Sequence, residues 1–308
     1  MAQRSPATDI FITLLAPLIW GSTYLITTEM LPDGRPLLAA FLRALPAGLI
    51  LLLISRRWLQ GEWWWRVAIL GALNIGAFFY FLFMSAYLLP GGVAALIANC
   101  QPVLVLLLAR LLLAEQVRPR QWAACAVGIS GVALLVLQPG LSLNTAGVLA
   151  GLAAAASMAT GIVLTKRWGR PEGMSLLNLT GWQLTLGGLM LLPVLLWQEG
   201  LPDTLSGLNV AGYSYLALFG ALIAYSLWFR GIERLPASTL SFMSLGSPLC
   251  ATLLGWLILG EALTPIQLLG AAAIVGTLWL ARPAAVKAPK QDAKPDDLLA
   301  SGAQPARK

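Results

Sequence analysis

The dominant pattern along the chain is a succession of long apolar stretches separated by short polar connections. A helix that crosses a bilayer needs ~20 mostly apolar residues, and each stretch is about that long. Apolar and polar residues do not alternate with period two, which argues against the strands of an outer-membrane barrel. The pattern therefore predicts an all-α membrane protein. Its ten expected transmembrane helices lie at about residues 10–28, 36–55, 66–88, 91–113, 119–137, 144–166, 175–197, 209–231, 237–259 and 264–282.

The composition excludes a soluble globular domain. Of the 308 residues, 58% are hydrophobic and 11% are charged, whereas soluble domains carry about 25% charged residues. Histidine is absent, and Cys100, Cys125 and Cys250 all fall inside apolar stretches. We therefore expect inert cysteines, no disulfide, no metal site and no cofactor.

Basic residues are concentrated in alternate connections between the apolar stretches. In one set of connections Arg35 is the only basic residue, and the other set holds most of the basic residues of the chain. The members of this second set are Arg4, Arg56, Arg57, Arg66, Arg118, Arg120, Lys166, Arg167, Arg170, Arg230 and Arg234, followed by the basic residues of the tail. Cytoplasmic loops are enriched in Lys and Arg, so the pattern predicts that both termini are cytoplasmic. It also explains the net charge of +7 by a lipid bilayer, with no nucleic-acid partner.

The second half of the chain repeats the first. At an offset of 146 residues a series of prolines, a glutamate and a glutamine coincide, and at an offset of 140 Gly48 coincides with Gly188. The coincident pairs are Pro90 and Pro236, Pro102 and Pro248, Glu115 and Glu261, Pro119 and Pro265, and Gln121 and Gln267.

The repeat predicts two domains of five helices each, 1–137 and 144–282, followed by a disordered cytoplasmic tail at 283–308. Five is an odd number, so the second half enters the membrane upside down relative to the first. Inverted repeats of this kind are typical of transporters, whose substrate site lies near the midplane between the halves.

Two repeated hairpins carry the clearest motif, PVLVLLLARLLLAEQVRP at 102–119 and PLCATLLGWLILGEALTP at 248–265. Pro102 and Pro248 are expected to bend their helices near the middle of the membrane and to act as hinges. The glutamates should end these helices at the interface, and Pro119 and Pro265 should begin the next ones.

The hairpins occur together with APLIWGSTYLITT at 16–28 and FLRALPAGLIL at 41–51. In combination, these segments and the repeat resemble the EamA family of the drug/metabolite transporter (DMT) superfamily, and within it a PecM-like branch, over about residues 10–282. The resemblance implies a bacterial inner-membrane exporter of small metabolites, such as amino acids, and not an enzyme.

Trp20, Thr23 and Tyr24 combine an aromatic face with a hydroxyl group on the first helix, since residues four apart share a face. They are candidates for lining a substrate cavity, and close packing of this helix is the alternative. Arg43 is the basic residue that lies well inside an apolar stretch, where charges are usually functional. It could meet a substrate carboxylate, or it could pair with Glu29 or Asp33 at the helix end.

The resemblance also implies that the third, fourth, eighth and ninth helices line the central cavity. Tyr80 and Tyr225 are equivalent by the repeat to within a residue or two. The polar and aromatic residues of these helices complete the expected substrate site: Asn74, Tyr80, Asn99, Gln101, Tyr225, Trp228, Ser244 and Ser247.

No Asp or Glu lies in the middle of an apolar stretch, so the sequence favours facilitated or weakly proton-coupled export by alternating access. Glu29, Glu115 and Glu261 remain candidates for proton coupling at a gate. The expected substrates are amino acids or aromatic, planar compounds, and the alternative function is a multidrug/proton antiporter. A monomer is sufficient for this architecture, and the sequence leaves a dimer open.

Overall fold

The computed structural model describes residues 6–89, 97–136, 144–260 and 264–280, and within these ranges it contains helices and turns but no strand. Two π-helices, η1 and η2, interrupt long helical segments. The helices of the first half are α1 (Pro6–Met30), α2 (Pro36–Ser55), α3 (Trp63–Gly71), η1 (Ala72–Gly76), α4 (Ala77–Leu88), α6 (Gln101–Leu113) and α7 (Pro119–Val136). Those of the second half are α8 (Thr145–Trp168), α9 (Leu176–Gln198), α10 (Gly207–Tyr215), η2 (Leu216–Ile223), α11 (Ala224–Arg234), α12 (Ala237–Met243), α13 (Gly246–Leu259) and α14 (Pro265–Leu280).

The all-helical membrane class predicted from the sequence is confirmed. Over the described ranges, seven helical segments are long and apolar enough to cross a bilayer, and shorter apolar helices occupy Gln101–Leu113 and Pro265–Thr277. The seven segments are Ala7–Met30, Pro36–Ser55, Trp63–Ser85, Thr145–Trp168, Leu176–Gln198, Gly207–Arg234 and Ala237–Leu259. The count of ten spans and the inversion of the second half stay predictions, and the tail at 283–308 lies outside the described residues.

The two Pro…Glu hairpins are built alike. Ala114 and Gly260, which coincide at the 146-residue offset, end α6 and α13 in the left-handed conformation, with φ of 53° and 68°. A left-handed residue stops a helix because the backbone can no longer continue the i to i−4 hydrogen bonds. Helices α7 and α14 then begin at Pro119 and Pro265, as predicted.

The prolines expected to bend continuous helices occupy a different position. The chain leaves the helix at 99–100 and again at 244–245. Pro102 and Pro248 follow in the first turns of α6 and α13, where a missing N–H group breaks no intrahelical hydrogen bond. The fourth and ninth segments are therefore broken at these turns, and the role of the prolines as hinges stays a prediction.

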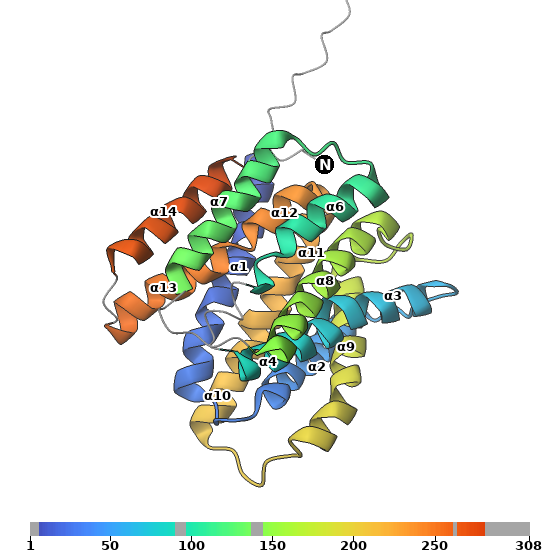
Figure 1. The fold of residues 1–308 in the computed structure, drawn as a ribbon. Coiled ribbons are helices and arrows are strands. Elements are labelled where there is room, and N and C mark those ends of the chain that lie inside the picture. The colour runs from blue at the N-terminus through green and yellow to red at the C-terminus, as the bar shows by residue number, and fades with distance from the viewer. Residues whose placement is uncertain (1–5, 90–96, 137–143, 261–263, 281–308) are drawn as a thin grey trace, which may run out of the picture.

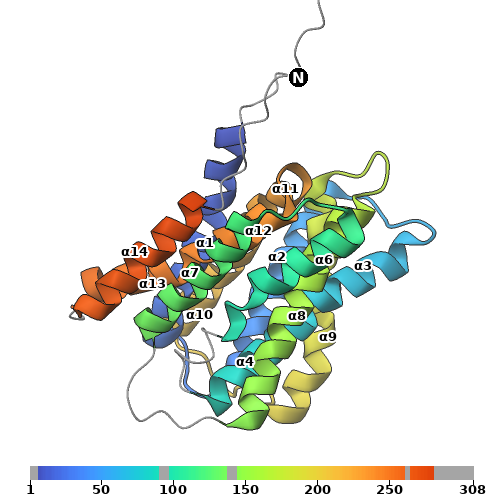
Figure 2. The same cartoon turned by 45° about the horizontal axis from the view of Figure 1, so that its top comes forward.

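The helices pack in pairs that correspond between the halves. Helix α2 packs on α9, and α7 packs on α14. Helix α8 contacts α4 and α6, while its counterpart α1 contacts α11 and α13. Figures 1 and 2 show α7, α13 and α14 together on one side of the bundle, with α2, α3 and α9 on the opposite side. Equivalent helices of the two halves either contact each other or make equivalent contacts, and this correspondence supports the predicted repeat.

Close approach of α2 and α9 depends on glycine. A Cβ atom on Gly48 would lie 2.5 Å from both the backbone nitrogen and Oγ1 of Thr185, and one on Gly188 would lie 2.9 Å from the backbone nitrogen of Leu45. These two glycines are the pair that coincides at the 140-residue offset. Small residues that let backbones approach are a main source of helix association in membranes.

We expect Gly48→Ala to destabilise the bundle by about 1–3 kcal/mol, because the added methyl group meets backbone that cannot move aside. The measurement is the temperature at which heating in detergent halves the monodisperse peak of the purified protein in size-exclusion chromatography. Gly276→Ala is the matched control, since nothing lies within 4 Å of a Cβ atom there. Equal midpoints for the two variants would contradict tight packing at Gly48.

Candidate functional site

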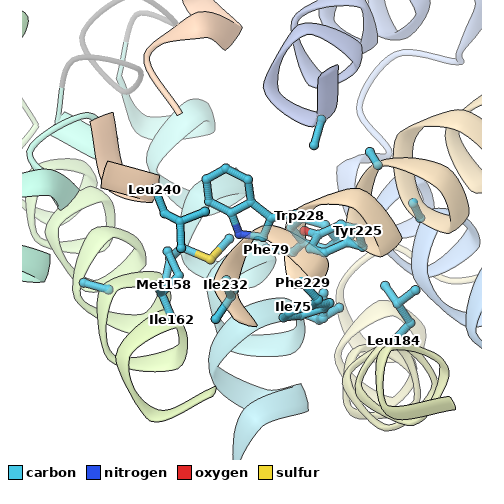
Figure 3. Packing of buried hydrophobic residues seen from close by; sticks show 14 of the residues in the cluster. Ile75, Phe79, Met158, Ile162, Leu184, Tyr225, Trp228, Phe229, Ile232 and Leu240 are labelled. Carbon is cyan, nitrogen blue, oxygen red and sulfur yellow. The ribbon is translucent and has the colours of Figure 1, made fainter. Parts of the chain in front are cut away.

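Aromatic side chains from both halves gather inside the bundle. Trp20 of α1 lies against Tyr225 and Trp228 of α11, with ring centroids 5.1 and 5.2 Å away. Phe79 of α4 meets Tyr225 edge-on at 6.4 Å, and the two coincide at the 146-residue offset. Figure 3 shows Phe79, Tyr225 and Trp228 close together among buried aliphatic residues. We call Trp20, Phe79, Tyr225 and Trp228 the aromatic cluster.

The aromatic cluster adjoins a backbone carbonyl in a π-helix. Gly220 lies in η2, and its carbonyl oxygen accepts hydrogen bonds from Nε1 of Trp20 and Nη2 of Arg43, each at 3.0 Å. A π-helix shifts the backbone pairing from i+4 to i+5, and such segments often mark functional sites. Two side chains from the first half thus converge on one backbone atom of the second half.

Arg43 places a positive charge beside the aromatic cluster. Its Cζ atom lies 5.2 Å from the ring centroid of Phe79, in range for a cation–π interaction. A guanidinium inside a membrane bundle is costly to bury, and aromatic faces and a carbonyl oxygen reduce that cost. The group is therefore directed toward Gly220 and Phe79, a geometry that suits a substrate carboxylate.

A second polar contact between the halves occupies the position equivalent to the Arg43–Gly220 contact. Asn74 of η1 coincides with Gly220 at the 146-residue offset, and Gln183 of α9 coincides with Arg43 at the 140-residue offset. Nδ2 of Asn74 donates to Oε1 of Gln183 at 2.8 Å and to Oγ1 of Thr165 at 3.0 Å. The structure therefore directs Asn74 toward α8 and α9, where a neutral amide pair stands in place of the Arg43–Gly220 contact.

Other residues predicted for the first and third helices show mixed positions. Thr23 is buried, and its hydroxyl donates to the carbonyl of Trp20 at 2.6 Å, so it serves its own helix. Tyr80 is half-buried and packs against Phe81. Tyr24 belongs to α1, but its side chain lies outside the described residues.

The four polar residues predicted for the fourth and ninth helices lie at the two helix breaks. Asn99 is in the turn before α6, and Gln101 is buried at the start of that helix. Ser244 donates to the carbonyl of Ser241 at 2.7 Å, and the Ser247 carbonyl would lie 2.6 Å from a Cβ atom on Gly21 of α1. Their sharing one pocket with the aromatic cluster stays a prediction.

Of the three glutamates considered for coupling, Glu115 has the clearest role. Its carboxylate accepts from the backbone nitrogens of Ala237 and Ser238 at 2.9 and 3.4 Å, and from Oγ of Ser238 at 3.1 Å. A carboxylate at a helix N-terminus satisfies unpaired N–H groups and complements the helix dipole. Glu115 thus fixes the start of α12. Glu29 is exposed near the end of α1, and Glu261 lies outside the described residues.

Contacts of charged side chains with the C-terminal end of α11 were not anticipated from the sequence. Asp9 at the start of α1 pairs with Arg230, and with Arg234 at 3.5 Å, on α11. Nζ of Lys166 donates to the carbonyls of Ile232 and Leu235 at 3.2 and 2.6 Å. The available signal was the pair of arginines four residues apart, which share a helix face. Gly220 and Phe79 carried no such signal, because a glycine and a phenylalanine are ordinary in any membrane helix.

The part of the chain that the structure describes holds no cluster of three or more His, Cys, Asp or Glu side chains that could bind a metal ion. Cys100, Cys125 and Cys250 are free thiols.

Comparison with known proteins agrees with this architecture. The EamA-like transporter family matches residues 8–137 and 145–282. Protein PecM of Dickeya dadantii is 48% identical over 280 residues, which cover 91% of this chain and 94% of that protein. A probable amino-acid metabolite efflux pump of Salmonella typhimurium is 26% identical, covering 88% of this chain and 94% of the pump.

A protein of known crystal structure shares the fold, with a TM-score of 0.77 at 23% sequence identity, over 90% of this chain and 97% of that one. The two family matches fall on the two halves that the repeat defines, and together they cover most of the chain. The chain belongs to the EamA-like transporter family.

Proposed function

We propose that the protein exports small metabolites, amino acids or aromatic planar compounds, across a bacterial inner membrane. The observation that carries the proposal is the Arg43 guanidinium beside the aromatic cluster. Trp20, Arg43 and Gly220 each lie near the middle of a helical segment suited to crossing the bilayer. Transporter sites are typically found at this depth, between the two halves.

The chemistry of the site favours a planar substrate that bears a carboxylate. Arg43 supplies a planar charged donor that can bind a carboxylate through two hydrogen bonds. Tyr225 and Trp228 are each 1% exposed, so a substrate would stack on them and on Trp20 after the bundle opens. Such stacking is worth about 0.5–1.5 kcal/mol for each aromatic pair. The relative from Salmonella typhimurium, a probable amino-acid metabolite efflux pump, supports the same class of substrate.

Contacts between the halves at both ends of the bundle support alternating access. At one end, Asp9 holds Arg230, and Glu115 holds the start of α12. At the other end, Nδ2 of Asn209 donates to the carbonyl of Met30 at 2.9 Å. We assign the Asp9 end to the cytoplasm, because the connections rich in arginine lie there. Transport would break one set of contacts at a time.

The positions of the acidic residues support facilitated or weakly coupled export. Asp9, Glu29 and Glu233 lie near helix ends, and Glu115 follows the end of α6. Asp9 and Glu233 pair with arginines, Glu115 caps the start of α12, and Glu29 is exposed. A multidrug/proton antiporter, the alternative function, would be expected to hold an acid near the aromatic cluster to attract cations.

The carboxylate assignment predicts a selective loss in Arg43→Gln. Efflux of labelled phenylalanine from proteoliposomes should fall by about 10-fold or more, since a hydrogen bond to a charged group is worth about 1.5–3 kcal/mol. Efflux of phenylalaninamide, which lacks the carboxylate, should change little. An equal loss for both compounds would show that Arg43 has a structural role, and no efflux of either by the wild type would remove phenylalanine from the substrate class.

The aromatic cluster predicts that Trp20→Ala lowers saturable efflux of aromatic substrates by about 10-fold or more. The variant loses two ring contacts and the hydrogen bond to Gly220, each worth about 1 kcal/mol. Trp197→Ala is the matched control, because that tryptophan is 82% exposed on α9. The test panel contains tryptophan, phenylalanine, threonine and a planar aromatic pigment. If threonine efflux fell as much as tryptophan efflux, stacking on Trp20 would not be the cause.

The cap on α12 predicts how Glu115→Gln behaves. Removing a cap costs about 0.5–2 kcal/mol, so the variant should lose stability and efflux together. The loss of efflux should be the same with and without an imposed pH gradient, and exposed Glu29→Gln should resemble the wild type. A loss that occurs only under the gradient would instead identify Glu115 as a coupling group.

A further inference from the structure

Six tryptophans gather where the loop between α2 and α3 meets the loop between α8 and α9. Trp58 and Trp64 pack on Trp182, with ring centroids 5.4 and 5.1 Å away, and Trp65 packs on Trp168 at 5.4 Å. Trp58, Trp64 and Trp65 are 73%, 42% and 49% exposed. Both loops lie at the same end of the molecule (Figure 2). We call this group the tryptophan patch; its members are Trp58, Trp63, Trp64, Trp65, Trp168 and Trp182.

An arginine side chain organises the indole rings. The Arg66 guanidinium lies 5.2 Å from the ring centroid of Trp63, 5.5 Å from that of Trp65 and 5.8 Å from that of Trp168. It also pairs with Glu62 at 2.9 Å. Arg66 is therefore engaged within the patch, and its charge serves to hold three rings in place.

The loop that presents the patch is anchored to the bundle. The carbonyl of Arg57 accepts from Nε1 of Trp182 and Nδ2 of Asn178, each at 3.0 Å. Leu59 is 3% exposed in a small apolar core beneath the loop. Because the backbone is fixed at both points, the exposed side chains on this loop keep a defined position relative to α8 and α9.

Exposed arginines flank the patch. The side chains of Arg56 and Arg57 come from this anchored loop, and Arg167 precedes Trp168 at the end of α8. Arg57 reaches the opposite loop, with Nη1 3.4 Å from the position of a Cβ atom on Gly173. Among the residues that the structure describes, no ion pair within 4.0 Å involves Arg56, Arg57 or Arg167.

We propose that the tryptophan patch, with Arg57 and Arg167, binds the headgroup of an anionic phospholipid. Indole rings favour the level of the headgroups, since one edge is apolar and the other carries a hydrogen-bond donor. Arginine binds phosphate oxygens through paired N–H groups. The occupant is a lipid because the patch lies where two membrane helices end and two begin, and three of its rings, those of Trp58, Trp64 and Trp65, are exposed there.

The patch is independent of the transport site. Trp20 and Arg43 lie near the middle of α1 and α2, whereas the patch surrounds the end of α2 and the start of α3. The lipid would bind at a fixed point on the outside of the bundle. Its loss would alter stability in the membrane without changing which substrate the aromatic cluster accepts.

Native mass spectrometry of the full chain in neutral detergent tests the proposal with phosphatidylglycerol and phosphatidylcholine as probes. The wild type should retain one phosphatidylglycerol and bind it at least 10-fold more tightly than phosphatidylcholine. The double variant Arg57→Gln/Arg167→Gln should bind phosphatidylglycerol about 25-fold more weakly, from about 1 kcal/mol for each arginine at an anionic surface. Arg110→Gln/Arg118→Gln is the control, because it removes two exposed arginines from α6 and the loop that follows it.

Two further comparisons distinguish a bound lipid from a soluble phosphate compound and from a general effect of exposed tryptophan. Trp58→Ala should weaken phosphatidylglycerol binding, whereas Trp197→Ala, an exposed tryptophan on α9, should not. Soluble glycerol phosphate should not compete with the lipid. Equal affinity of the wild type for the two lipids, equal loss in both arginine double variants, or competition by glycerol phosphate would each overturn the proposal. Unchanged melting of the lipid-free variants shows that a loss of binding is not a loss of folding.

Discussion

The whole architecture depends on one constraint, that a backbone polar group in hydrocarbon must find a partner within the protein. A regular helix satisfies its own backbone groups, so unpaired N–H and C=O groups arise where the helical hydrogen bonding is interrupted. At Gly220 the carbonyl receives two side-chain donors, Trp20 and Arg43. At the break before α12 the free N–H groups receive the Glu115 carboxylate. Polar and charged residues are thus placed where the regular backbone pairing stops.

The two halves have kept the same backbone and changed its chemistry. The π-helices occupy equivalent stretches, and the hairpins end in equivalent left-handed residues, Ala114 and Gly260. At the level of the π-helices, one half presents a charged guanidinium and the other a neutral amide. Equivalent backbone positions therefore carry different chemistry, and under the proposed function a substrate with a charged end and an apolar end would bind in one orientation.

The sequence was sufficient to predict the features that depend on the length of apolar stretches and on the spacing of residues. Apolar length predicted the helices, and the ordered prolines predicted the repeat and the starts of α7 and α14. It was insufficient where a contact joins distant residues. Trp20, Tyr225 and Trp228 were expected together and are together, but Asn74 was expected with them and turns to Gln183 instead. The break before Pro248 and the acceptor role of Gly220 depend on tertiary packing, which no local pattern encodes.

The double use of the Gly220 carbonyl has a mechanical consequence. The oxygen connects α1, α2 and η2 through hydrogen bonds from Trp20 and Arg43. Of these groups, the Arg43 guanidinium is the one best suited to bind a carboxylate. A carboxylate that draws the Arg43 guanidinium away would remove one of the two hydrogen bonds to the Gly220 carbonyl and leave the one from the Trp20 indole. Binding of a carboxylate would then be coupled directly to the loosening of α2 from η2, because both depend on the hydrogen bond between Arg43 and Gly220.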